Sequence, residues 1–161
     1  MGSGSRKEDK SVSDSTDIQF TQEEVLEQAQ GNATAFVLSV FAYLKQRDLD
    51  PDEYVAFFGR TFAPGWEDRR GRPVAEVARV AALNHVSVGG TLVSLSGDDT
   101  HAEVILTGWP DEEILGELEF TQSDGDRLLN AFEPIMEYLD IRYAWQREGE
   151  AVKLTFAKEH T

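Results

Sequence analysis

Apolar residues recur every three or four positions over two stretches in the first half of the chain, the spacing that places side chains on one face of an α-helix. The first stripe contains Phe36, Val37, Val40, Phe41 and Leu44. The second contains Tyr54, Phe57, Phe58, Thr61 and Phe62. It begins at Asp50-Pro51-Asp52-Glu53, where an aspartate cap, a proline at the first helical position and a glutamate at the third signal a helix start. We therefore predict two helices with inward-facing aromatic stripes.

A shorter helix is predicted upstream of these two. Thr21-Gln-Glu-Glu24 fits a capping box, in which the threonine oxygen and the glutamate side chain satisfy backbone groups at a helix start. Gly31-Asn32 favours a break near Gln30, with Asn32 capping the next helix. Residues 1–17 contain one aliphatic side chain after Met1 and cannot bury enough surface to offset the entropy of ordering. We expect a disordered tail over residues 1–17.

One helical stretch is apolar on nearly every side. Pro73 marks its start, and one face carries Val74, Val77, Ala78, Ala81 and Ala82. Val80 and Leu83 fall on other faces, a pattern typical of a helix that is covered on most sides. We expect this helix to be the central packing element, preceded by a loop that begins at Ala63.

Alternating segments predict two β-hairpins. The first follows Gly89-Gly90, with apolar and polar residues alternating on both sides of Gly97-Asp98-Asp99. The second alternates at Ile141, Tyr143, Trp145, Val152, Leu154 and Phe156. Between the hairpins, residues 126–139 have a broad apolar face, and Pro134 inside it should bend the helix.

This order of elements predicts an α+β fold. N-terminal helices are followed by a ββαββ unit, which can form a four-stranded antiparallel sheet packed against helices. With 161 residues, the chain fits one domain, which we expect over residues 18–161 after the tail.

Composition narrows the range of partners. A net charge of −15 argues against nucleic acid and against acidic lipid surfaces, which need basic residues on the protein. The absence of cysteine excludes disulfides, thiolate metal sites and a cysteine nucleophile. The sequence contains no apolar run of about 18 residues and no signal-peptide core, so we expect no membrane insertion and a cytoplasmic location.

Positive charge is concentrated at Arg69, Arg70 and Arg72, just before the expected central helix. Backbone amides and the positive end of the helix dipole at that point favour a carboxylate or phosphate ligand. Trp66 lies on the same segment. The alternative is a solvated loop in which Glu67 and Asp68 pair with the arginines.

Two histidines are candidates for chemistry. His85 falls at the end of the central helix, where it could act as a general base or ligand-binding group, or simply cap the helix. His101 lies beside Asp98 and Asp99, whose positions are explained by turn formation. We predict no metal site, and the sequence identifies no cofactor. It contains no nucleophile elbow, phosphate-binding glycine loop or HExxH motif.

Aromatic residues near these groups could line a pocket. Phe58 and Phe62 lie on the second aromatic stripe, and Trp109 precedes Pro110 at the end of the first hairpin. Pockets for apolar ligands are commonly lined by aromatic side chains. The alternative is that all of them are ordinary core residues.

From about Asn32 to Lys158, the order of elements resembles the 4-vinyl reductase family of small-molecule-binding domains. The resemblance rests on the helix ending Ala82-Leu83-Asn84-His85, the hairpin Thr91 to Thr107, the helix Asp126 to Leu139, and the strands Arg142 to Gln146 and Ala151 to Ala157. Members often carry cysteines near the C-terminal strands, and this chain has none. The resemblance implies a sensor or carrier pocket for a hydrophobic small molecule, often within a homodimer.

The sequence thus favours binding of a small, largely apolar or amphipathic ligand, with or without an anionic group, in a pocket between helices and sheet. The expected ligand-binding residues are Trp66, Arg70, Arg72, His85, Trp109, Phe58 and Phe62. Two alternatives remain: an enzyme of hydrolase or lyase type with His85 as general base, and an acidic protein-interaction module without a pocket.

Overall fold

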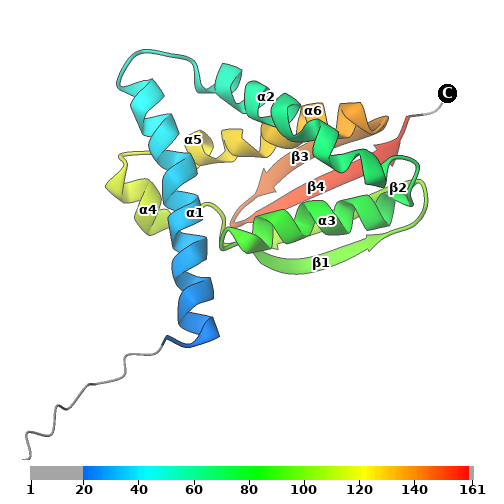
Figure 1. Ribbon diagram of the computed structural model, residues 1–161, viewed down its shortest axis with the longest axis horizontal. Helices are drawn as coiled ribbons and strands as arrows, with labels where there is room; N and C mark the ends of the chain where they lie inside the picture. Colours follow the sequence, from blue (N-terminus) through cyan, green and yellow to red (C-terminus); the bar gives the residue numbers. More distant parts are fainter. Residues whose placement is uncertain (1–19, 160–161) are drawn as a thin grey trace, which may run out of the picture.

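The structure is a computed structural model that describes residues 20–159 (Figure 1). The tail expected over residues 1–17 lies outside the described residues. The helices are α1 (Gln22–Lys45), α2 (Pro51–Phe62), α3 (Val74–Ser87), α4 (Glu112–Glu117), α5 (Gln122–Asp126) and α6 (Phe132–Tyr138), with 3₁₀ helices η1 (Ala63–Arg69) and η2 (Arg127–Ala131). The strands are β1 (Thr91–Gly97), β2 (His101–Thr107), β3 (Ile141–Glu148) and β4 (Ala151–Lys158).

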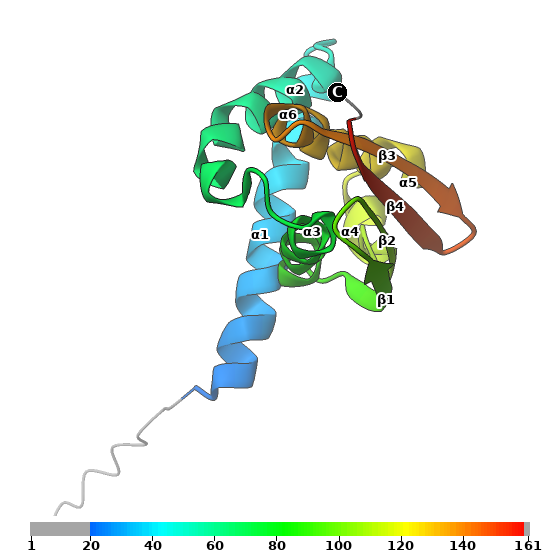
Figure 2. The ribbon, with the colours of Figure 1, turned by 90° about the vertical axis from the view of Figure 1, so that its right-hand side faces the viewer.

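The four strands form one antiparallel sheet in the order β1-β2-β4-β3. The two hairpins meet in the middle, where β2 pairs with β4 and Val104 lies opposite Leu154. Helix α3 packs on β1 and β2, and α6 packs on β3, on the same face of the sheet (Figure 2). The predicted α+β fold with its ββαββ unit is therefore confirmed.

The core lies between this face of the sheet and the helices. Helix α3 contributes the predicted stripe, which is fully or almost fully buried: Val74, Val77, Ala78, Ala81 and Ala82. The sheet contributes Ala102, Val104, Leu106, Val152, Leu154 and Phe156. One side of α3 faces solvent, however, and it includes Leu83, which is 58% exposed. The apolar character of this helix therefore extends beyond the part that packs in the core.

The break predicted at Gly31-Asn32 is wrong, because α1 continues through it. The predicted capping box at Thr21 and Glu24 is present. Two tertiary hydrogen bonds flank the glycine: Gln30 Nε2 donates to the Val86 carbonyl at 3.0 Å, and Thr34 Oγ1 donates to the Val88 carbonyl at 2.8 Å. They fix both turns against the end of α3, which offsets the ~1 kcal/mol helix penalty of glycine.

The aromatic stripes are also less buried than predicted. Helix α2 starts at Pro51 with Asp50 as its cap, as expected, but Phe57 and Phe62 are exposed. Val55 and Gly59 occupy its buried face instead. A Cβ on Gly59 would lie 2.3 Å from the Ala131 carbonyl oxygen, so glycine permits a close approach of α2 to η2 that larger residues would prevent.

Two connecting segments differ from the sequence-based expectation. The predicted loop that begins at Ala63 is instead the 3₁₀ helix η1, which continues directly from α2. The helix predicted to start at Ser123-Asp-Gly-Asp126 and to run to residue 139 is divided into α5, η2 and α6, and α5 begins with a Thr121–Asp124 capping box. Pro134 lies within α6, at its first turn.

Candidate functional site

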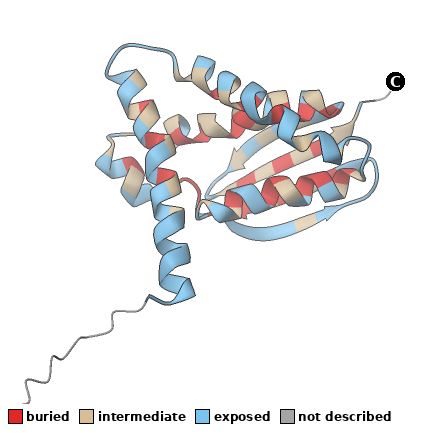
Figure 3. Ribbon diagram, viewed as in Figure 1, coloured by how far each residue is buried: buried red, intermediate tan, exposed pale blue. Residues whose placement is uncertain are grey.

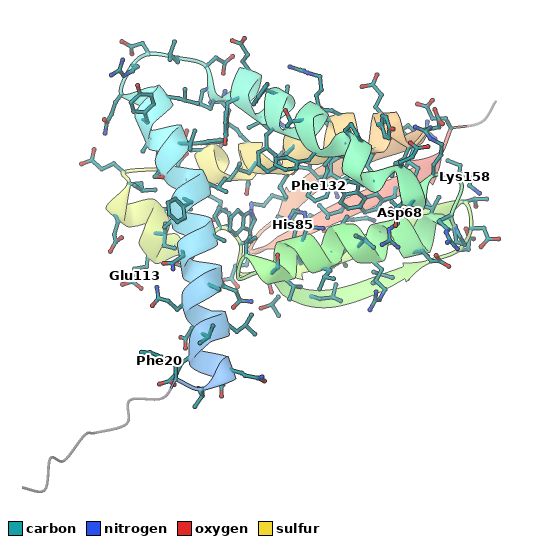
Figure 4. All side chains as sticks on the ribbon, in the orientation of Figure 1. Phe20, Asp68, His85, Glu113, Phe132 and Lys158 are labelled. Atoms are coloured by element: carbon teal, nitrogen blue, oxygen red, sulfur yellow. The ribbon has the colours of Figure 1, made fainter. Side chains whose placement is uncertain are left out.

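His85 lies in the last turn of α3, and its side chain extends toward α6 (Figure 4). Its ring centroid is 5.0 Å from that of Phe132. The residue is 5% exposed, and its Nε2 atom is buried without a hydrogen-bond partner. Buried polar atoms are rarely left unpaired, since each costs about 1–3 kcal/mol. This nitrogen is therefore the most unusual polar group in the described core.

Burial lowers the pKa of His85 to about 4. The imidazole is consequently neutral near pH 7, where one ring nitrogen donates and the other accepts a hydrogen bond. A neutral, desolvated imidazole can bind a hydroxyl, amide or carbonyl group. It does not supply the positive charge that a carboxylate ligand would require.

Phe132 connects His85 to three other aromatic residues. Its ring centroid lies 6.0 Å from that of Trp66 in an edge-to-face arrangement and 6.2 Å from that of Tyr143. Tyr143 in turn lies 5.3 Å from Phe156. We call this set the aromatic seam: Trp66, His85, Phe132, Tyr143 and Phe156. Geometries of this kind are favourable for aromatic pairs.

The inner end of the aromatic seam is fixed more firmly than its outer end. The Tyr143 hydroxyl donates to the Leu129 carbonyl at 3.2 Å, and burial raises the pKa of this phenol. Phe156 is fully buried on the sheet. Trp66, Phe132 and Tyr143 are each partly buried. The seam thus reaches the surface at η1 and α6 as well as on β3.

The arginines of the predicted anion site make contacts outside the aromatic seam. Arg70 donates to the Tyr138 carbonyl and pairs with Asp140 at 2.7 Å and Glu67 at 3.2 Å. The neighbouring Glu67 carboxylate raises the pKa of this guanidinium. Arg69 pairs with Asp68 at 3.4 Å. These contacts match the alternative expectation of a solvated loop, in which Glu67 and Asp68 form ion pairs with the arginines.

The start of α3 offers fewer free amides than the sequence suggested. The amide of Val74 donates to the Asp99 carbonyl at 3.3 Å, and that of Ala75 to the Asp98 carbonyl at 3.0 Å. The turn of the first hairpin therefore caps the helix. Arg70 and Arg72 line a shallow hollow of about 210 Å³ with Asp140 and other residues of the sheet edge.

The remaining candidates do not join the seam. Trp109 is buried in the core, and its carbonyl accepts a hydrogen bond from Arg147 Nη2 at 3.0 Å. Phe58 and Phe62 pack against each other on α2 with tilted rings, whose centroids are 4.7 Å apart. Of the predicted ligand-binding residues, the structure brings together Trp66 and His85, through Phe132.

Sequence reasoning missed Phe132 and Tyr143 as site residues. Both were assigned to apolar faces, Phe132 in the helix between the hairpins and Tyr143 in the strand that follows it. Helical or alternating spacing identifies such residues as buried, but it does not show which of them contact a histidine 47 positions earlier in the chain, as Phe132 does. A long-range aromatic contact leaves no local signal.

The hairpin turn beside His101 uses its aspartate for turn formation. Asp98 Oδ1 accepts hydrogen bonds from the Thr100 amide at 2.7 Å and the His101 amide at 3.0 Å. Within residues 20–159, no three histidine, aspartate or glutamate side chains are grouped so that they could hold a metal ion.

No protein-family model matches this chain, and no curated protein has a significantly similar sequence. The resemblance to the 4-vinyl reductase family therefore stays a prediction. In the described part of the chain, the helices are too short or too polar to cross a bilayer.

Proposed function

We propose that this domain binds a small, largely apolar ligand in the aromatic seam, through one neutral hydrogen-bonding group that reaches His85. The observation that supports this proposal is the buried Nε2 atom without a partner. A ligand hydroxyl or carbonyl that pairs with Nε2 removes the energetic penalty of the unpaired nitrogen. The aromatic rings around it match the apolar remainder of the ligand.

Entry of a ligand requires Phe132 to move, because its ring fills the space beside His85. The partial exposure of Phe132 and Trp66 supports a path from the surface at this point. Rotation of one partly buried side chain is a modest rearrangement compared with opening the sheet. Trp66 then becomes a natural reporter of binding.

Of the ligand features expected from the sequence, an anionic group is the one that the aromatic seam accommodates least well. The seam holds a neutral histidine, whereas Arg70 and Arg72 lie before the opposite end of α3. From Val74 to His85 the helix extends roughly 16 Å at about 1.5 Å per residue. A carboxylate could use the arginines only on a ligand long enough to span that distance. We therefore propose a neutral polar group for short ligands.

The test compares 2-naphthol with naphthalene by tryptophan fluorescence, on wild type, His85→Phe and a His101→Phe control. Wild type should bind 2-naphthol more tightly by about fivefold, the value of one hydrogen bond. His85→Phe should lose that preference and His101→Phe should keep it. A Trp66→Phe variant should lose most of the fluorescence change.

A second pair of probes tests the role of charge: 2-naphthoic acid and its methyl ester. The ester should bind at least as well as the acid, because no cation lies in the seam. An acid that binds more tightly, and loses this advantage in Arg72→Ala, would favour an anionic ligand. Absence of saturable binding by any probe, or a hydroxyl preference that survives in His85→Phe, would refute binding in the seam.

The alternative functions have unequal support. Catalysis with His85 as general base would be helped by an orienting carboxylate, and none pairs with Nε2 in the described residues. A protein-interaction role is favoured by a specific observation, the exposed apolar residues on α1, which include Leu26 and Phe36.

A further inference from the structure

Helix α1 has two apolar faces, and the body of the protein covers one of them. The covered face contains Thr34, Leu38 and Phe41, each at most 2% exposed. On the other side, Leu26, Phe36 and Tyr43 are 59%, 74% and 52% exposed. The N-terminal half of α1 also projects beyond the rest of the molecule and is exposed along its length (Figures 1 and 3).

Apolar side chains on the other side of α1 follow a regular spacing. We call them the outer face of α1: Leu26, Ala29, Phe36 and Tyr43, which are exposed, and Ala33 and Val40, which are partly buried. The intervals alternate between three and four residues, as at the a and d positions of a heptad repeat. This spacing is typical of the contact line between two helices in a coiled coil. The solvent-facing side of a helix normally carries polar residues instead.

We propose that two copies of this chain associate through the outer faces of their α1 helices, in antiparallel orientation. The outer face lies away from Leu38 and Phe41, so pairing leaves the packing of the covered face intact. It requires that Arg47, whose guanidinium lies 4.6 Å from the centroid of the Tyr43 ring, shift aside. The aromatic seam takes no part in this contact. The inference is therefore independent of the proposed ligand.

The order of large and small side chains favours the antiparallel arrangement. Around a twofold axis between residues 34 and 35, Leu26 lies opposite Tyr43 of the second copy. The same axis places Ala29 opposite Val40 and Ala33 opposite Phe36. A small residue thus meets a larger one at both inner levels, which allows interdigitation. A parallel pair would instead place Phe36 against Phe36 and Ala33 against Ala33.

Charge also favours the antiparallel arrangement. The first turns of α1 carry Glu23, Glu24 and Glu27, Lys45 is its last residue, and Arg47 lies in the turn that follows. Antiparallel pairing brings the acidic end of each helix beside the basic end of the other. A parallel pair would place six carboxylates together, in a chain whose net charge is already −15.

The size of the outer face sets the expected affinity. The three exposed large side chains, Leu26, Phe36 and Tyr43, offer roughly 100–150 Å² each, so a dimer would bury about 600–900 Å² in total, just below the usual lower limit for a specific interface. We therefore expect a dissociation constant on the order of 10 μM, since area of this size gives weak association.

The first test is sedimentation equilibrium of the full chain across concentrations from about 2 μM to about 200 μM, which bracket this constant. Wild type should change from monomer to dimer. The double variant L26E/F36E should stay monomeric with unchanged helical circular dichroism, because both side chains are exposed. The control Phe57→Glu alters a phenylalanine on α2 that is 58% exposed, about as much as Leu26, and should dimerise like wild type.

The second test determines the relative orientation of the two α1 helices. Because the sequence contains no cysteine, an introduced cysteine is the only thiol in each chain. Ala29 and Val40 are opposite one another in the antiparallel pair, whereas the two copies of either residue are far apart. Oxidising a mixture of A29C and V40C chains should give the mixed disulfide in large excess over either homodimer. Selective formation of the A29C homodimer would show a parallel pair and overturn the proposed arrangement.

Three other results would overturn the proposal as a whole. They are a wild-type chain that stays monomeric at the highest concentration, a dimer that persists in L26E/F36E, and loss of the dimer in Phe57→Glu. The last would place the interface on α2 instead.

Discussion

Arg147 on β3 and Asp126 at the end of α5 are joined by two hydrogen bonds of 2.6 Å, from Nε to Oδ2 and from Nη2 to Oδ1. Their side chains are 18% and 8% exposed, which makes this the most buried ion pair among the described residues. Arg147 also donates to the Trp109 carbonyl at 3.0 Å, and Gln122 Nε2 donates to Asp126 at 3.1 Å. The pair therefore ties β3 to α5 and to the segment after β2.

Replacing Asp126 with alanine should destabilise the protein by about 3 kcal/mol, the lower end of the range for a buried pair, because it leaves the largely buried Arg147 side chain, 18% exposed, without its counter-charge. Urea denaturation followed by circular dichroism measures this loss. As a control, Glu103→Ala disrupts the more exposed pair with Lys153, whose N–O distance is 2.9 Å. That change should cost less than about 1 kcal/mol. Similar losses in both variants would show that burial does not decide the strength of these pairs.

A second prediction concerns two helical glycines in different surroundings. Gly59→Ala should destabilise the protein, because the new Cβ would lie 2.3 Å from the Ala131 carbonyl oxygen and 3.0 Å from Pro134. Gly31→Ala should stabilise it by about 0.5–1 kcal/mol, since nothing lies within 4 Å and alanine favours the helix. Thermal unfolding should give a lower melting temperature than wild type for Gly59→Ala and a higher one for Gly31→Ala. Stabilisation by both would mean that α2 can move away from η2 at little cost.

The order of elements could be predicted because their periodicity is local. The alternation around Val104 and Leu154, the cap at Asp50 and the stripe at Val77 each depend on a few neighbouring residues, and all are present in the structure. The error at Gly31 has the opposite origin. Propensity there favours a break, but hydrogen bonds to residues more than 50 positions away hold the helix together.

The site could be predicted only in part for the same reason. His85 and Trp66 were candidates by residue type, yet their relation depends on Phe132, which belongs to a different element. The aromatic residues on α2 looked like a pocket wall because helical spacing identifies a shared face without showing what covers it. Phe62 proved to be exposed.

A third prediction tests the central role of α3 in the core. Val77→Asp buries a carboxylate with no partner among the packed apolar residues, which should cost several kcal/mol and abolish cooperative unfolding. Leu83→Asp is the matched control on the same helix, because that position is 58% exposed. It should change stability by less than about 1 kcal/mol. Cooperative melting of the Val77 variant near the wild-type temperature would contradict this account of the core.

The last prediction concerns pH. In the unfolded chain His85 takes up a proton as the pH falls through about 6.5, whereas in the folded protein burial holds its pKa at about 4. Between these values the unfolded state binds more protons, so the free energy of unfolding falls as the pH is lowered from 6.5 to 4. The two pKa values correspond to a loss on the order of 3 kcal/mol. Above pH 7 this contribution should be constant.

His85→Phe isolates this effect, because it removes the titrating group and keeps an aromatic ring beside Phe132. Urea unfolding at pH 7.0 and pH 5.0 should show a decrease for wild type that exceeds the decrease for His85→Phe by about 2 kcal/mol, since most of the window lies between these pH values. Carboxylates such as Glu67 and Asp98, whose pKa is lowered by hydrogen bonds, contribute equally to both proteins and cancel. His101→Phe, on the exposed start of β2, should retain the full wild-type dependence. An identical pH dependence in wild type and His85→Phe would mean that the imidazole reaches water or a partner in solution, and it would remove the unpaired nitrogen on which the proposed ligand site rests.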